Sequence, residues 1–259
     1  GVMAESPAAP ANTHGRAGRN LPAAIGMGVG LGAYLVLSLL YFKPAFVVLV
    51  AVALVLASVE LHEALKKLGM TSAIVPIAIG SVAISFGSYF AGRQEPVIFS
   101  TTSVLLASLA LTVLASLIWR MPKGIAGFVP DAAASLLIIA YVPLLGSFGP
   151  LMLAEAQGGA RLVTFFLIVV MSDTGGYIAG VLFGKHPMAP KISPKKSWEG
   201  AAGSLILGTT AAICMAIFAL HVPFWVGIIL GISLVVVGTC GDLIESIIKR
   251  DIGIKDMSS

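Results

Sequence analysis

The chain has 259 residues, of which 58% are hydrophobic and 11% charged, and its formal net charge at pH 7 is +4. A mean hydropathy of +0.99 excludes an ordinary soluble domain. The apolar residues gather in runs of about twenty, the length that an α-helix needs to cross a bilayer. The composition therefore predicts an all-α protein, a polytopic transmembrane helical bundle.

The apolar runs predict about eight membrane spans. In chain order they are Leu21–Leu40, Pro44–Val59, Ser72–Ala91, Ile98–Trp119, Ala126–Leu145, Leu162–Phe183, Ala201–Leu220 and Pro223–Ile248. Residues 1–20, rich in Ala, Pro, Gly and Asn, predict a disordered cytoplasmic N-terminal tail. We expect N-terminal transmembrane helices over 21–160 and a second transmembrane region over 161–259, with a cytoplasmic loop at 184–200.

The distribution of basic residues predicts the orientation of these spans. If the N-terminus is cytoplasmic, only three of the 16 lysines and arginines lie on the outer side: Lys43, Arg93 and Arg161. Both termini are therefore predicted to be cytoplasmic. The basic inner face suits anionic lipid headgroups or nucleotides, and no pattern indicates nucleic-acid binding. Cys214 and Cys240 both lie in predicted spans, which does not favour a disulfide framework or a zinc site.

The first half of the chain has few polar residues in its spans. Glu60, His62 and Glu63 come at the cytoplasmic end of the second span, where they predict either an ordinary charged helix end or a contact with lipid headgroups. Asp131 follows Pro130 at the start of the fifth span, where an acidic residue favours the helix dipole.

The sixth span carries an aspartate near mid-membrane. Counting helical turns places Asp173 on one face with Gly176, Tyr177, Gly180 and Gly184. Small residues on such a face indicate close helix packing, or a place where a ligand reaches the backbone. Because an unpaired carboxylate is costly in a membrane, Asp173 is predicted to line a polar cavity.

The loop that follows is dense in groups that bind phosphate. Ser193, Lys195, Lys196 and Ser197 supply hydroxyl donors and mobile positive charge. Ser193-Pro194 predicts a turn, and Ser197 or Glu199 is expected to start the seventh helix. A lone His186 is interpreted as a surface histidine.

The last span ends in a polar stripe. At 100° per residue its members share one side of the helix: Asp242, Glu245, Ser246, Lys249 and Arg250. Lysines and arginines at a helix end commonly snorkel to the interface, but that does not explain carboxylates one to two turns deeper. A carboxylate pair beside clustered cations suits a magnesium ion and the phosphates that it carries.

These motifs together resemble one enzyme family. Ser193-Pro194-Lys195-Lys196-Ser197-Trp198-Glu199-Gly200, Gly241-Asp242-Leu243-Ile244-Glu245-Ser246, the following Lys249-Arg250 and Lys255-Asp256, and Asp173-Thr174-Gly175-Gly176-Tyr177 are similar to the motifs of the phosphatidate cytidylyltransferases. The matches cover about the last third of the chain and lie on the predicted cytoplasmic side. Residues 161–259 are therefore predicted to be the catalytic region.

The resemblance implies transfer of cytidylyl from CTP to phosphatidate with Mg²⁺ in the inner (plasma) membrane, and it leaves room for a second cation. It implies that Asp242 is a metal ligand and that Asp242, Asp173, Lys249 and Arg250 are catalytic residues. The substrate-binding residues that it implies are Ser193, Lys195, Lys196, Ser197, Glu245, Ser246, Lys255 and Asp256. The implied partners are CTP, phosphatidate and membrane lipids, and a homodimer is a further possible assembly. Beyond Ser259, where this sequence ends, the family signature continues to an aspartate that supplies a second metal carboxylate.

Two other functions remain open at this point. A CTP-dependent lipid or polyprenol kinase would use similar motifs to transfer the γ-phosphoryl group. A cation-coupled transporter would use Asp173, Asp242 and Glu245 as an ion path, although a solute path needs no phosphate-binding loop on one face.

Overall fold

The computed structural model describes residues 17–93 and 96–253, and this part of the chain is almost entirely helical. Its α-helices are α1 (Ala17–Tyr41), α2 (Lys43–Lys66), α3 (Ile74–Phe90), α4 (Thr101–Arg120), α5 (Phe128–Ile139), α6 (Phe148–Ala154), α7 (Gly158–Phe183), α8 (Trp198–Phe218) and α9 (Phe224–Ile252). Short turns of other helix types are η1 (Ala91–Arg93), η2 (Met121–Lys123) and η3 (Ala140–Leu144). The two strands are β1 (Pro187–Ala189) and β2 (Ser193–Ser197). Most of the tail predicted for 1–20 lies outside the described residues.

The helices confirm an integral membrane protein. Among the described residues, seven helical segments are long and apolar enough to cross a bilayer, and α3 is a shorter apolar helix. The fifth predicted span was too short, because the helical path runs on from α5 through η3 to Ala154. Pro143 lies inside η3 and removes a backbone donor, so the path changes helix type there and resumes as α6.

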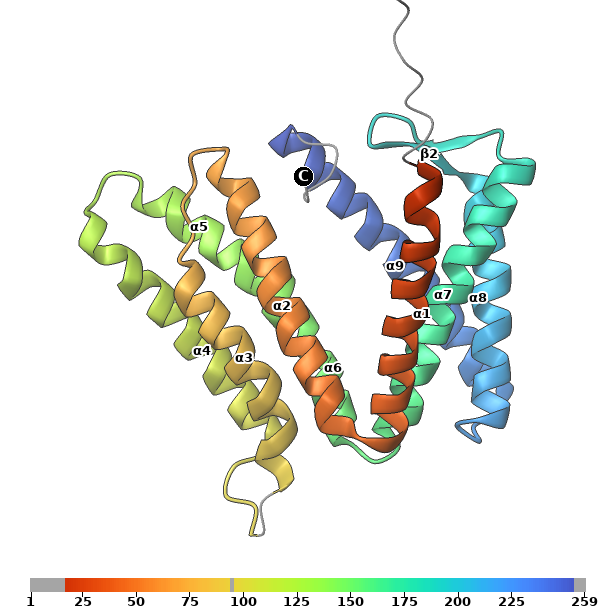
Figure 1. Cartoon of the computed structure of the whole chain (residues 1–259), viewed down its shortest axis with the longest axis horizontal. Coiled ribbons are helices and arrows are strands. Elements are labelled where there is room, and N and C mark those ends of the chain that lie inside the picture. Colours follow the sequence, from red (N-terminus) through yellow and green to blue (C-terminus); the bar gives the residue numbers. More distant parts are fainter. Residues whose placement is uncertain (1–16, 94–95, 254–259) are drawn as a thin grey trace, which may run out of the picture.

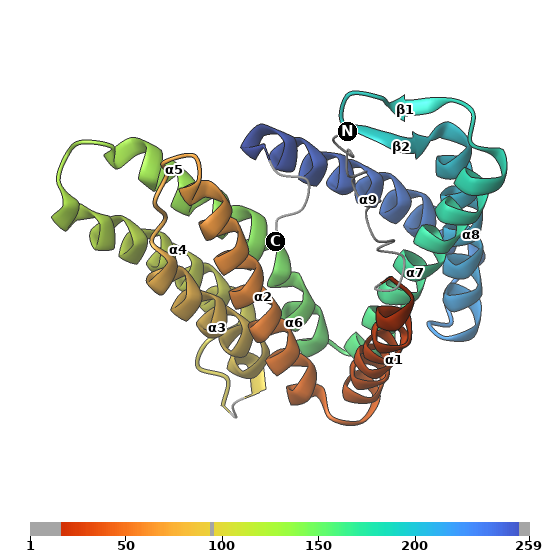
Figure 2. The ribbon, with the colours of Figure 1, turned by 45° about the horizontal axis from the view of Figure 1, so that its top comes forward.

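The bundle has two groups of helices (Figure 1). Helices α2 to α5 pack around an apolar core that includes Leu61, Ile77 and Ile138, while α7, α8 and α9 stand together on the other side. Helices α1 and α6 lie between them, and their buried residues Leu39 and Leu153 share a second apolar core with α2, α3 and α7. The last turns of α9 reach back across the bundle, and Ile248 and Ile252 pack against the core of the first group (Figure 2). The polar end of α9 is therefore held between both groups.

The ends of the helices that are rich in lysine and arginine lie on one side of the bundle. The end of α2, the end of α4, the β1–β2 hairpin and the end of α9 all lie at the top of Figure 1. The predicted orientation requires the basic helix ends to lie on one side of the bundle, as they do. That this side faces the cytoplasm stays a prediction.

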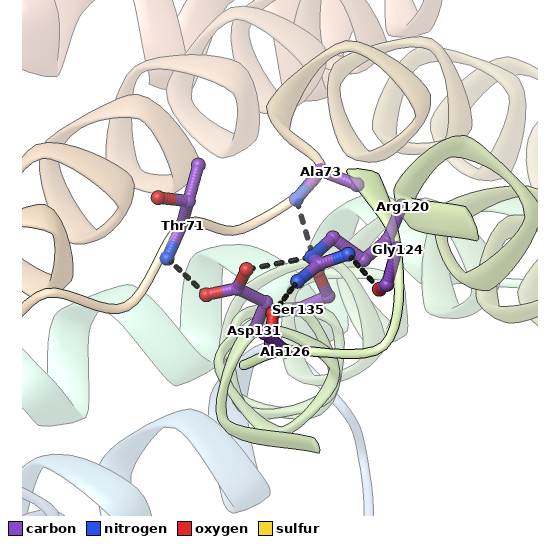
Figure 3. Close-up of polar contacts among 7 residues, drawn as sticks. All are labelled: Thr71, Ala73, Arg120, Gly124, Ala126, Asp131 and Ser135. Atoms are coloured by element: carbon purple, nitrogen blue, oxygen red, sulfur yellow. Dashed lines mark hydrogen bonds and ion pairs between the residues drawn. The ribbon is translucent and has the colours of Figure 1, made fainter. Parts of the chain in front are cut away.

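A buried ion pair joins two connections on this side (Figure 3). Arg120 Nε donates to Asp131 Oδ2 at 2.6 Å, and the other guanidinium nitrogens donate to the carbonyls of Gly124 and Ala126 at 2.9 and 2.8 Å. The second oxygen of Asp131 accepts the backbone N–H of Thr71 at 2.7 Å. Asp131 lies in the first turn of α5 as expected, but its main role is to tie the α2–α3 and α4–α5 connections together.

Helices α7 and α8 approach closely along a line of small residues. A Cβ placed on Gly203 would fall well inside van der Waals contact with Ala179 and with the carbonyl oxygen of Gly175. Between the same helices, Ser204 Oγ donates to the carbonyl of Ser172 at 2.8 Å. This close approach fixes the position of the part of α7 that carries Asp173.

Gly203→Ala should therefore force α7 and α8 apart. We expect a loss of about 1–3 kcal/mol of stability, the usual range for overpacking, measured as a lower midpoint of thermal unfolding in detergent. Gly28→Ala is the matched control, because a Cβ on Gly28 has no atom within 4 Å. Equal midpoints for Gly203→Ala and Gly28→Ala would contradict the close packing.

Candidate functional site

A cavity of about 300 Å³ lies where α7, α8, α9 and β2 meet. We call it the first cavity. Asp173 comes from α7, Lys195 and Lys196 from β2, and Asp242 from α9. The wall is completed by backbone at Gly176 and Gly180 and by hydroxyls from Ser172, Ser197, Ser204 and Thr239. Residues that are up to seventy positions apart thus form one polar surface with two carboxylates and two ammonium groups.

Two of these charges are already paired. Lys196 Nζ lies 3.2 Å from Asp242 Oδ2, and the two side chains are 28% and 60% exposed. Because both remain accessible, the pair is not a permanently buried bridge. Asp242 is open to a cation, and Lys196 is open to an anion, as soon as ligands compete for them.

A second cavity, of about 770 Å³, lies beside the first. Its polar lining is Ser193 and Lys195 from β2 and Ser246, Lys249 and Arg250 from α9. Lys195 lines both cavities. The stripe on α9 is therefore divided, with Asp242 in the first cavity and the two cations in the second.

Glu245 lines neither cavity. Its Oε1 lies 2.9 Å from Lys249 Nζ, an i,i+4 pair on α9. This pair orients Lys249, and the substrate-binding role of Glu245 stays a prediction.

The phosphate-binding loop is a hairpin. β1 and β2 pair antiparallel, with Pro187 opposite Ser197 and Ala189 opposite Ser193. The turn predicted at Ser193-Pro194 was wrong, since both residues belong to β2. A proline is tolerated there because β2 has a partner on one side only. The prediction that Ser197 starts the next helix is confirmed, since its Oγ accepts the N–H of Gly200 at 3.1 Å and caps α8.

The structure brings together ten of the twelve sequence-predicted site residues, either in the cavity walls or, for Glu245, beside them. Lys255 and Asp256 lie outside the described residues. Tyr177, expected on the face of Asp173, is 74% exposed and lines neither cavity. Sequence reasoning missed Ser172, Ser204 and Thr239. Thr239 stands three residues before Asp242, so helical spacing was a usable signal, whereas Ser204 required the α7–α8 packing.

The first cavity offers carboxylate oxygens, the ligands that Mg²⁺ prefers. Among the described residues, no group of three or more His, Cys, Asp or Glu side chains is placed to hold a metal ion. Asp173 and Asp242 nevertheless line one cavity. Mg²⁺ is commonly held by one or two carboxylates together with substrate phosphates and water, so these two side chains fit a metal that arrives with its substrate.

The sequence is similar to those of known proteins. A model of the cytidylyltransferase family matches residues 22–259. A phosphatidate cytidylyltransferase of Mycobacterium leprae is 42% identical over 258 residues, covering 93% of this chain and 80% of the relative. One of Mycobacterium bovis is 37% identical over 275 residues, covering 99% and 87%. One of Staphylococcus saprophyticus is 41% identical over 127 residues, about half of each chain. The chain therefore belongs to the cytidylyltransferase family.

Proposed function

We infer that the chain transfers a cytidylyl group from CTP to phosphatidate, forming CDP-diacylglycerol and pyrophosphate for phospholipid biosynthesis. The family and the names of the relatives support this function. The structural observation that carries it is the pair of cavities joined at Lys195, with carboxylates in one and Lys249 and Arg250 in the other.

Two joined cavities suit a reaction between two polyanions. CTP and phosphatidate each bring phosphate oxygens, which lysine and arginine bind as charge-assisted hydrogen-bond acceptors. A cation that borders both cavities can contact both phosphates and lower their mutual repulsion. We propose that Lys195 has this role, and that Ser193, Ser197 and Ser246 add hydroxyl donors at the two sides.

The reaction itself is an in-line displacement. A phosphatidate oxygen attacks the α-phosphorus of CTP, a new P–O bond forms, and the bond from the α-phosphorus to the oxygen that bridges to the β-phosphate breaks, releasing pyrophosphate. The attacking phosphate is already an anion, so no strong general base is required. The side chains contribute by positioning the two substrates and by stabilising negative charge.

Asp242 and Asp173 are the residues proposed to hold Mg²⁺. When bound, the ion would offset negative charge on the phosphate oxygens of CTP. Lys196 would then leave Asp242 and bind a phosphate oxygen. A second cation stays an expectation of the family resemblance.

We further propose that the site faces the cytoplasm from the inner (plasma) membrane, where CTP is available. The concentration of basic helix ends on the side of the hairpin supports this orientation. Phosphatidate would enter from the surrounding lipid. Assembly as a homodimer stays a prediction.

The function is tested by the substrate requirement of pyrophosphate release. Purified protein in mixed micelles with Mg²⁺ should release pyrophosphate only when CTP and phosphatidate are both present. The assay is run on this chain and on a form extended past Ser259 by the family's metal-binding segment, so that an incomplete metal site is recognised by activity in the extended form alone. Release of CDP with diacylglycerol or a polyprenol as acceptor would indicate the kinase alternative, and no nucleotide turnover in either form would contradict both.

A further inference from the structure

The hairpin that carries Lys195 and Lys196 needs outside support to hold its shape. β1 has three residues and β2 has five, and their pairing is interrupted between Pro187 and Ala189. A two-stranded hairpin of this size is marginal in water on its own. Because both lysines line the cavities, whatever fixes the hairpin also fixes the phosphate-binding charges.

The base of the hairpin is closed by two residues that lie outside both cavities. His186 precedes β1, and Glu199 lies in the first turn of α8. His186 Nδ1 lies 2.5 Å from Glu199 Oε1, and the backbone N–H of His186 donates to Oε2 at 3.2 Å. The N–H of Trp198 donates to the carbonyl of His186 at 3.0 Å. One carboxylate thus holds both the backbone and the ring of His186 against the start of α8.

The other supports belong to the site itself. Arg250 Nε donates to the carbonyl of Ile192 in the hairpin turn at 2.7 Å, and Lys196 pairs with Asp242. Both cations are proposed to meet phosphate, so their contacts with the protein compete with substrate. The His186–Glu199 pair lies outside both cavities, so phosphate bound in them does not compete for it.

We propose that His186 and Glu199 are positioning residues that hold the hairpin in the conformation in which Lys195 and Lys196 meet substrate phosphates. This inference rests on the proposed function. Without the pair, the competent conformation is populated for a smaller fraction of the time, and the apparent affinity falls by that fraction. Saturating substrate restores the conformation, so KM rises while kcat is retained.

The kinetic test uses His186→Ala, Glu199→Ala and the double variant. The His186 side chain is 77% exposed, so we expect each single variant to raise the KM for CTP about two- to fivefold, with kcat within about twofold of wild type. The double variant should be no worse than either single one, because both remove the same contact. His186→Asn should return KM to near wild type, because its side-chain amide can donate to Glu199. Glu155→Ala, at the end of α6 away from the hairpin, should change neither constant.

A merely structural role for Glu199, such as starting α8, gives a different result. It would reduce the folded, active fraction, so apparent kcat would fall with KM unchanged, and His186→Ala would not reproduce the effect. Either observation would overturn the proposal.

A second readout does not depend on activity. Lys191 is exposed in the turn between β1 and β2, and trypsin cleavage after it reports how firmly the hairpin is held. We expect faster cleavage in both alanine variants and wild-type cleavage in His186→Asn. Unchanged cleavage in all variants would overturn the proposal. If neither this chain nor its extended form transfers a cytidylyl group, the proposed function fails, and this readout alone decides the role of the pair.

Discussion

Asp242→Asn is expected to reduce cytidylyl transfer by about 10²-fold or more, the loss typical of removing one electrostatic contributor from an active site. Asn preserves the shape of Asp242 but not the charge that faces Lys196 in the first cavity. The proposed metal loses a ligand, and Lys196 loses its partner in the absence of substrate. Initial rates at saturating CTP and phosphatidate measure the effect.

Asp251→Asn is the matched control, because Asp251 lies on the same helix, is exposed and lines neither cavity. It should retain a rate close to that of wild type. An Asp242→Asn protein that folds, inserts and turns over at the wild-type rate would rule out the proposed role of Asp242.

Asp131→Ala is expected to lower the free energy of unfolding by about 3–5 kcal/mol, because it leaves the buried guanidinium of Arg120 without its counter-charge. The side chains of Arg120 and Asp131 are only 7% and 13% exposed. The backbone N–H of Thr71 also loses its acceptor. The measurement is the midpoint of unfolding in a denaturing detergent, compared with wild type.

Glu63→Ala provides the comparison for an exposed pair. The side chain of Glu63 is 62% exposed and its Oε1 lies 3.9 Å from His62 Nε2, so its loss should change stability by no more than about 1 kcal/mol. Folded Asp131→Ala molecules should keep the wild-type KM for CTP, since Asp131 lines neither cavity. Equal unfolding midpoints for the two variants would show that the buried network contributes little.

Hydropathy was sufficient to predict the helical bundle, because each span must satisfy its own backbone and remain apolar over a bilayer's thickness. It failed where the helical path depends on local backbone chemistry, as at Pro143, beyond which α6 continues to Ala154. The hairpin was missed because its strands have only three and five residues, so their periodicity carries little signal.

The site was partly predictable for a related reason. Charged groups are conspicuous in apolar spans, so the sequence alone was enough to single out Asp173 and Asp242. That Asp173 and Asp242 line the same cavity was not predictable, because the first cavity depends on the glycine contact between α7 and α8. The ion pair between Arg120 and Asp131 was likewise not predictable, because it requires the side chain at the end of α4 to reach the start of α5. His186 and Glu199 lie thirteen residues apart, and only the closed hairpin brings them together.

The most direct test of the proposed function follows two labels of CTP with the purified protein, Mg²⁺ and mixed micelles that contain phosphatidate, diacylglycerol and a polyprenol. In parallel reactions CTP carries label at the α- or the γ-phosphorus, and lipid is separated from the aqueous phase. Cytidylyl transfer predicts that α-label enters the lipid while γ-label leaves as pyrophosphate. γ-Label in the lipid with α-label retained in soluble CDP would contradict this account and establish a kinase instead.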